Sequence, residues 1–237
     1  MHTRFCLIQV LAISLLSTAT LPRPALAAEP NLTTNRWEPD IEAFEATDKT
    51  NPPPQQAILF IGSSSIRIWS DLQRDFPGHK VFKRGFGGSE LSDSVWFANR
   101  IVIPYRPKMI LLYAGDNDIA GGKSPERILS DFKEFVQKVH AALPQTQIAY
   151  IAVKPCPDRK KFLPEVRATN RLIQDYTKTD GKLTFIDIYG PMLDENGGLR
   201  PELFRSDGLH MNAKGYAIWV SIIKPVLDRN DTLAPGG

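Results

Sequence analysis

The stretch Ala57-Ile58-Leu59-Phe60-Ile61-Gly62-Ser63-Ser64-Ser65 decides the fold. Its apolar residues follow one another without polar alternation, which predicts a short strand buried on both faces. Strands of this kind form parallel sheets that helices cover on both sides. Because ligands bind at the carboxyl ends of such strands, the polar residues that follow Gly62 are candidates for a functional site.

The same pattern recurs along the chain. Further strands are expected at residues 81–82, 108–115, 147–153 and 183–188. Segments with helical spacing of apolar residues lie between them, so the sequence predicts an α/β fold. We expect a three-layer α/β/α sandwich, flavodoxin-like, with a parallel sheet of about five strands. The last helix is expected to kink or end near Lys224, because Pro225 cannot donate a backbone hydrogen bond.

The composition is that of a globular protein. The 237 residues include 29 Lys and Arg against 26 Asp and Glu, and 42% are hydrophobic. The net charge of +3 gives no case for a nucleic-acid partner. Since no apolar run reaches the roughly 18 residues of a membrane span, none is expected in the mature chain.

The N-terminus has the pattern of a secretory signal peptide. Arg4 precedes the uncharged stretch 5–16, and the small-residue site Ala25-Leu26-Ala27 follows. The sequence therefore predicts cleavage near Ala27 and export to the periplasm or the cell exterior. The alternative is a short anchor helix held by a Pro-rich linker. Cleavage would leave Cys156 as the one cysteine, so no internal disulfide framework is expected.

We divide the chain into four parts on this basis. Residues 1–27 form the signal peptide, and residues 28–56 form a lead-in and Pro-rich connector. The globular domain spans 57–228, and 229–237 form a flexible tail.

The residues after the predicted strands can build an acyl-transfer site. A serine hydroxyl such as that of Ser64 becomes a nucleophile when a base takes its proton, and His210 is the natural base. Asp207, three residues earlier, can bind the other ring nitrogen and orient it. Backbone N–H groups of Ser64 and Gly88, with the side-chain amide of Asn117, can stabilise the oxyanion that forms.

Other motifs are incomplete. The segment Gly85-Phe86-Gly87 lacks the third glycine of a dinucleotide fingerprint, because Glu90 occupies that position. A calcium loop that begins at Asp116 would require Glu at the position of Arg127. The histidines and cysteines do not have zinc-ligand spacing. We therefore expect no cofactor and no metal.

These residues resemble those of the SGNH, or GDSL-like, hydrolase family over about residues 57–227. The most specific pieces are Asp207-Gly208-Leu209-His210 and Gly115-Asp116-Asn117-Asp118. The resemblance implies Ser64 as nucleophile, Asp207 and His210 as its triad partners, and Gly88 and Asn117 as oxyanion groups. The family's first block usually reads Gly-Asp-Ser, whereas this chain has Ser63 before Ser64. Ser63 and Ser65 therefore remain rival nucleophiles.

Two further groups are candidates for substrate binding. The loop 154–162 carries Arg159 and Lys160, which either bind an anionic group of the substrate or form a solvated basic surface. Trp96 and Phe97 either line an acyl pocket or pack as buried helix residues. Cys156 is interpreted as an inert loop thiol.

We therefore expect an exported serine esterase that acts on a small-molecule, saccharide or lipid ester. Three alternatives stay open. They are an acyltransferase of the same fold, a non-catalytic carbohydrate-binding domain, and a nucleotide-binding flavodoxin-like protein.

Overall fold

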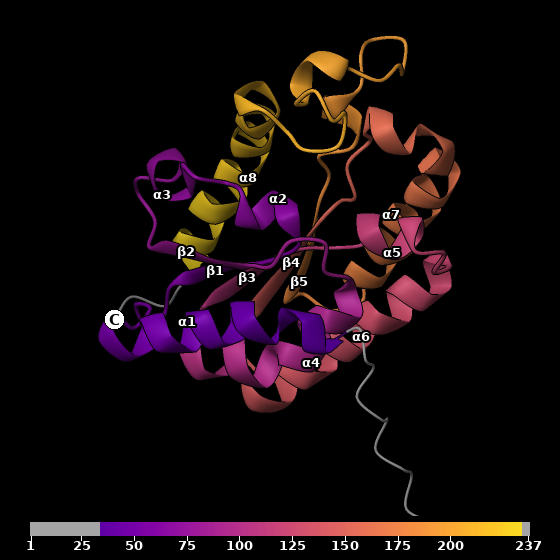
Figure 1. Cartoon of the computed structure of the whole chain (residues 1–237). Coiled ribbons are helices and arrows are strands. Elements are labelled where there is room, and N and C mark those ends of the chain that lie inside the picture. The colour runs from indigo at the N-terminus through magenta and orange to yellow at the C-terminus, as the bar shows by residue number, and fades with distance from the viewer. Residues whose placement is uncertain (1–33, 234–237) are drawn as a thin grey trace, which may run out of the picture. The chain divides into compact units, whose positions relative to one another are not determined.

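The computed structural model describes residues 34–233, with side chains from residue 36 to residue 229 (Figure 1). The predicted signal peptide and the first residues of the predicted lead-in lie outside this range. No helix within the described range is long and apolar enough to cross a membrane.

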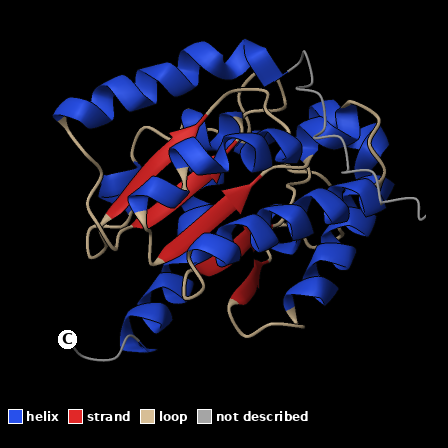
Figure 2. Cartoon of the chain, turned by 90° about the horizontal axis from the view of Figure 1, so that it is seen from below, coloured by secondary structure: helices blue, strands red, loops and turns tan. Residues whose placement is uncertain are grey.

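A parallel sheet of five strands forms the centre of the fold, with the strand order β2-β1-β3-β4-β5 (Figure 2). The strands are β1 (Ile58–Gly62), β2 (Val81–Gly85), β3 (Met109–Tyr113), β4 (Gln147–Ile151) and β5 (Leu183–Ile186). The order reverses between β1 and β3, which is where folds of this class bind ligands. The expected fold class is confirmed.

Helices cover both faces of the sheet (Figure 1). One face carries α1 (Glu38–Thr50), α4 (Leu91–Ile101), α6 (Pro125–Ala142) and α7 (Leu163–Thr177). The other face carries α2 (Ser64–Arg67), α3 (Leu72–Asp75) and α8 (Ala213–Leu233). The short α5 (Asp116–Ala120) follows β3, and the 3-10 turns are η1 (Thr34–Trp37), η2 (Ile103–Tyr105), η3 (Pro157–Phe162), η4 (Gly190–Met192) and η5 (Pro201–Leu203).

The strands are apolar on both faces because each face lies under a helical layer. In β1, Leu59 and Ile61 belong to the core under α4 and α6, whereas Ile58 and Phe60 belong to the core under α8. All four side chains are fully buried. Burial of one such side chain stabilises the fold by about 1.5–3 kcal/mol, so the run without alternation is the expected sequence for this strand.

The last helix corrects one expectation. A kink or an end was expected near Lys224, and the helix does not end there, because α8 continues through Pro225 to Leu233. A proline inside a helix costs about 3 kcal/mol. Val226 and Leu227, which follow it, are buried in the core, and each contributes about 1.5–3 kcal/mol. Burial of the next helical turn therefore offsets the lost hydrogen bond.

The segment before the first strand also joins the fold. The predicted lead-in and connector contain α1, which extends over Glu38–Thr50. Its Ile41 is fully buried in the core. Arg100 of α4 donates two hydrogen bonds to Glu45 of α1, at 2.7 and 2.8 Å. Much of this segment is thus a helix that covers the sheet.

The strand register brings three loops to one edge of the sheet. Gly62, the last residue of β1, is paired with Gly85 of β2 on one side and with Tyr113 of β3 on the other. Gly62 has a φ of +138°, and a Cβ at this position would lie 1.8 Å from the Tyr113 carbonyl oxygen. Only glycine allows the chain to leave β1 at this close approach.

Replacing Gly62 with Ala should therefore destabilise the protein by more than about 4 kcal/mol, or prevent folding, because backbone atoms must move. Gly78→Ala is the matched control, since a Cβ there meets nothing within 4 Å, and it should change the free energy of unfolding by less than about 0.5 kcal/mol. Urea denaturation measures both. A Gly62→Ala protein with the stability of the wild type would contradict the requirement for glycine at the end of β1.

Candidate active site

Three loops at the carboxyl edge of the sheet carry the predicted site residues. Ser64 begins α2 directly after β1, Gly88 follows β2, and Asn117 lies in α5 directly after β3. The loops are tied to one another, because the Asn117 side-chain Nδ2 donates to the Ser89 carbonyl oxygen at 2.9 Å. A fourth loop, between η5 and α8, carries Asp207 and His210.

Ser64, His210 and Asp207 form a continuous chain of hydrogen bonds. Ser64 Oγ lies 3.0 Å from His210 Nε2, and His210 Nδ1 lies 2.7 Å from Asp207 Oδ2. The other carboxylate oxygen of Asp207 accepts the backbone N–H groups of Leu209 and His210, both at 2.9 Å. An ionised carboxylate can only accept, so it selects the tautomer with the proton on Nδ1. His210 Nε2 is then free to accept the proton of Ser64.

Asp207 is held in its ionised form. Burial raises the pKa of this carboxyl, but hydrogen bonds from the backbone and the ring of His210 outweigh that effect and lower the pKa to about 2. The side chains of His210 and Asp207 are 27% and 46% exposed. The chain of hydrogen bonds is therefore open to water.

The two rival serines point elsewhere. Ser63 and Ser65 are buried, and neither Oγ has a hydrogen-bond partner in the described part of the chain. Ser65 follows Ser64 in α2, and successive helical residues point about 100° apart, whereas Ser63 precedes the helix with an extended backbone. Ser64 therefore reaches His210, while its two neighbours are buried.

The predicted oxyanion groups have different surroundings. Ser64 is the first residue of α2, so its N–H has no acceptor within the helix. Gly88 has a φ of +77°, and its carbonyl oxygen accepts Arg36 Nη2 at 2.9 Å. Asn117 has two N–H bonds on Nδ2, and the contact with Ser89 occupies one of them.

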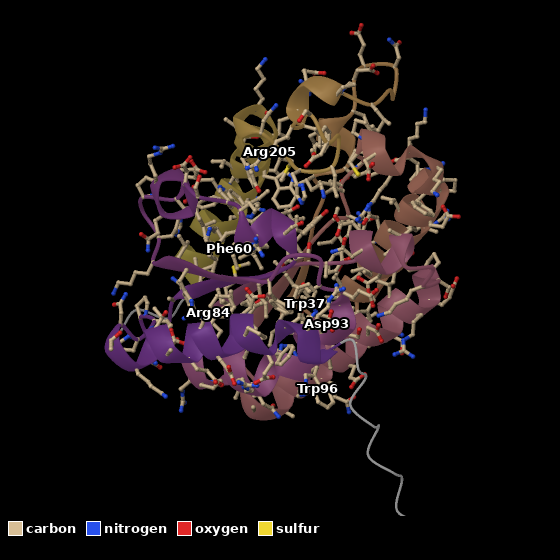
Figure 3. All side chains as sticks on the ribbon, viewed as in Figure 1. Trp37, Phe60, Arg84, Asp93, Trp96 and Arg205 are labelled. Atoms are coloured by element: carbon tan, nitrogen blue, oxygen red, sulfur yellow. The ribbon has the colours of Figure 1, made fainter. Side chains whose placement is uncertain are left out.

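The Gly88 loop rests on a tryptophan that the sequence pattern does not single out. The Trp37 ring lies within 3.4 Å of a Cβ built on Gly88, and it meets the Phe86 ring edge-on at 5.9 Å. Trp37 Nε1 donates to Asp93 at 3.1 Å, and Figure 3 shows these two side chains together at α4. Asp93 in turn accepts the backbone N–H of Glu90 at 2.8 Å, which caps α4. Trp37 lies just before the helical pattern of residues 40–48, in which Ile41 and Phe44 share one face, so that pattern does not reveal its role.

A buried cluster of charges lies behind Asn117. Lys154 Nζ donates to Asp116 Oδ2 at 2.8 Å and to Tyr113 Oη at 2.9 Å, and the Lys154 side chain has no exposed surface. Burial would raise the pKa of Asp116, but the charges of Lys154 and Arg159 lower it below its ordinary value. Arg159 Nη2 donates to Asn117 Oδ1 at 2.9 Å. A lysine at the end of the apolar run 147–153 was the available signal for this cluster.

The remaining predicted residues lie in three different settings. Arg159 lies against Asn117 and is mostly buried, whereas Lys160 is exposed to solvent. Neither predicted role of Trp96, in an acyl pocket or in buried helix packing, matches its position. It is 44% exposed on the outer side of α4, away from the sheet (Figure 3). The inner face of α4 is formed by residues such as Val95, Phe97 and Ala98, so Trp96 points outward.

Cys156 is buried, and burial raises the pKa of its thiol. Among the described residues, no group of His, Cys, Asp or Glu is arranged to hold a metal ion.

Comparisons with known proteins show the family and the fold of this chain. The sequence profile of the GDSL-like Lipase/Acylhydrolase family matches residues 62–218. A GDSL-like lipase of Bacteroides thetaiotaomicron has a similar structure, with 22% identity over 80% of this chain and 98% of that chain, and a TM-score of 0.70. A family 3 carbohydrate esterase of Clostridium thermocellum has 15% identity over 77% and 100% of the two chains, with a TM-score of 0.62.

A lipase/acylhydrolase of Enterococcus faecalis has 17% identity over 75% of this chain and 97% of that chain, with a TM-score of 0.61. At these identities the structural matches establish the fold. None of the curated proteins matches this chain in sequence.

Trp37→Ala should destabilise the protein by about 3–5 kcal/mol, because it leaves a cavity beneath the Gly88 loop and removes the donor to Asp93. Trp96→Ala is the matched control and should change the free energy of unfolding by less than about 0.5 kcal/mol, since its side chain is exposed. Chemical denaturation compares the two variants. Equal losses of stability would contradict the contrast between a buried Trp37 and an exposed Trp96.

Proposed function

Because the chain belongs to the GDSL-like lipase/acylhydrolase family, we propose that it is an exported serine esterase that cleaves carboxylic esters through an acyl-enzyme on Ser64. The observation that carries the proposal is the chain of hydrogen bonds from Ser64 Oγ through His210 to Asp207, at 3.0 and 2.7 Å. Export rests on the leader pattern at residues 1–27. Small-molecule, saccharide and lipid esters are the proposed substrates.

The first half of the reaction forms the acyl-enzyme. Ser64 Oγ attacks the acyl carbonyl carbon while His210 Nε2 accepts the hydroxyl proton. The oxyanion of the tetrahedral intermediate binds the N–H groups of Ser64 and Gly88 and the free N–H of Asn117. Asp207 stays ionised and stabilises the imidazolium. The C–O bond to the alcohol then breaks, and His210 protonates the leaving oxygen.

The second half releases the acid. Water attacks the acyl-enzyme carbonyl while His210 accepts its proton, and the Ser64–acyl bond breaks as the proton returns to Oγ. The exposure of His210 and Asp207 lets water reach the acyl-enzyme from bulk solvent. Product analysis with a polyol acceptor distinguishes hydrolysis from transfer, and an acylated polyol as the main product would make the protein a transferase.

The wild type should be labelled by a fluorophosphonate probe and should hydrolyse p-nitrophenyl esters, and Ser64→Ala and His210→Ala should lose both activities. Removal of a nucleophile or its base typically costs about 10⁴-fold to 10⁶-fold in turnover. Ser63→Ala and Ser65→Ala are the matched controls and should still be labelled. Labelling that persists in Ser64→Ala would identify another nucleophile, and a folded wild type that is neither labelled nor active would favour a binding domain.

The activity should fall on acidification because a protonated imidazole cannot accept the Ser64 proton. Asp207, with its pKa lowered to about 2, keeps its charge from pH 4 to pH 9. Because one protonation, that of the base, is then enough to stop the reaction, kcat/KM should fall about tenfold per pH unit on the acid limb. Initial rates from pH 4 to 9 measure the slope. A fall of about a hundredfold per unit, or a rate that does not change between about pH 5 and 8, contradicts this assignment.

A further inference from the structure

The orientation of the Asn117 amide is fixed by two neighbours of opposite chemistry. Nδ2 faces the Ser89 carbonyl oxygen at 2.9 Å, which can only accept a hydrogen bond. Oδ1 faces Arg159 Nη2 at 2.9 Å, and a guanidinium can only donate. A flipped amide would lose both bonds, because it would place Oδ1 against the Ser89 carbonyl oxygen and Nδ2 against the Arg159 guanidinium. The second N–H of Nδ2 makes no hydrogen bond within the described residues.

Arg159 is itself held in position by the loops of the site. It lies in η3, the next element after β4 along the chain, and its side chain is 16% exposed. The neighbouring Asp158 donates its backbone N–H to the Gly208 carbonyl oxygen at 3.1 Å. Since Gly208 lies between Asp207 and His210, this hydrogen bond joins the turn that carries Arg159 to the loop that carries His210.

The charges of Asp116, Lys154 and Arg159 do not cancel. Lys154 Nζ lies 2.8 Å and Arg159 Nη1 lies 3.7 Å from Asp116 Oδ2, so these three groups together carry one excess positive charge. Asp118, the next carboxylate along the chain, is paired with Lys123 instead. Lys154 is the closer partner of Asp116, and its side chain has no contact with solvent. Arg159 Nη1 makes no hydrogen bond within the described residues. The excess positive charge therefore lies on the guanidinium that contacts the amide.

We propose that Arg159 is a positioning residue for the oxyanion site, acting through the Asn117 amide. It sets the direction of the free N–H and polarises the amide, because a cation at Oδ1 makes the N–H groups stronger donors. This inference rests on the proposed function, in which Asn117 binds the oxyanion. It differs from direct recognition of an anionic substrate, since Arg159 Nη2 is engaged by Asn117 Oδ1.

A double-mutant cycle tests the proposal. Arg159→Ala should lower kcat for a neutral ester, phenyl acetate, by about 10- to 100-fold, less than the roughly 10²–10³-fold loss of a whole oxyanion donor. KM should change by less than about twofold, since the interaction strengthens only in the transition state. Arg159→Lys keeps a charge and a donor and should recover part of the loss. In an Asn117→Ala background, Arg159→Ala should have almost no further effect.

Lys161→Ala, an exposed neighbour in the same turn, is the control and should retain wild-type kcat. Phenyl acetate and its para-sulfonated analogue separate positioning from substrate recognition. A rise in KM confined to the sulfonated ester would overturn the proposal in favour of anion binding. An equal loss of kcat with and without Asn117 would also overturn it, because the effect would then not pass through the amide.

A spectroscopic measurement separates this inference from the proposed function. The side-chain amide resonances of Asn117 in a ¹H–¹⁵N spectrum should shift in Arg159→Ala and stay in place in Lys161→Ala. If the wild type hydrolysed no ester, the proposed function would fail while these resonances still decided whether Arg159 holds the amide. Unchanged Asn117 resonances in Arg159→Ala would overturn the inference.

Discussion

The pairing of β1 with its two neighbours is the constraint on which the site depends. Gly62 lies opposite both Gly85 and Tyr113, so β1, β2 and β3 end at the same level of the sheet. At the end of β1, Gly62 lies close to the Tyr113 carbonyl oxygen, and the backbone N–H of Ser63 donates a hydrogen bond to that oxygen at 3.1 Å. α2 therefore begins at one fixed position, with Ser64 as its first residue. A shift of one residue would turn the strand's side chains to the opposite faces and move the loops apart.

Two groups of charged residues lie at the carboxyl edge of the sheet. On one side, the Asp207 carboxylate is ionised, partly exposed and hydrogen-bonded to His210, which fixes the tautomer of the ring. On the other side, Lys154 and Asp116 are buried and neutralise each other, and the charge of Arg159 is left over next to Asn117. In the proposed reaction, the first side stabilises the imidazolium and the second side stabilises the oxyanion. The protein thus places opposite charges where opposite charges develop, and it does so without reorganisation.

Much of this arrangement could be predicted from local sequence. Apolar runs such as that before Gly62 identify strands, and strand ends in a parallel sheet meet at one edge, so Ser64, Gly88 and Asn117 could be expected to approach one another. Asp207 and His210 lie before the last helix, and their place beside Ser64 was expected from the chemistry of the set. Contacts between loops could not be predicted, because they depend on loop conformations that have no periodic signal. The bond from Arg159 to Asn117 is of this kind. The prediction that the last helix could end at Pro225 failed for a different reason. Proline disfavours a helix locally, but burial of the residues that follow Pro225 outweighs this effect.

The most direct test of the proposed mechanism is a crystal structure of the wild type after reaction with a methylphosphonate ester, whose adduct resembles the tetrahedral intermediate. We predict a bond from phosphorus to Ser64 Oγ, with the phosphonyl oxygen within hydrogen-bonding distance of the Ser64 and Gly88 N–H groups and of Asn117 Nδ2. Arg159 should remain on Asn117 Oδ1. An adduct on another residue, or an Asn117 amide turned away from the phosphonyl oxygen, would contradict the mechanism.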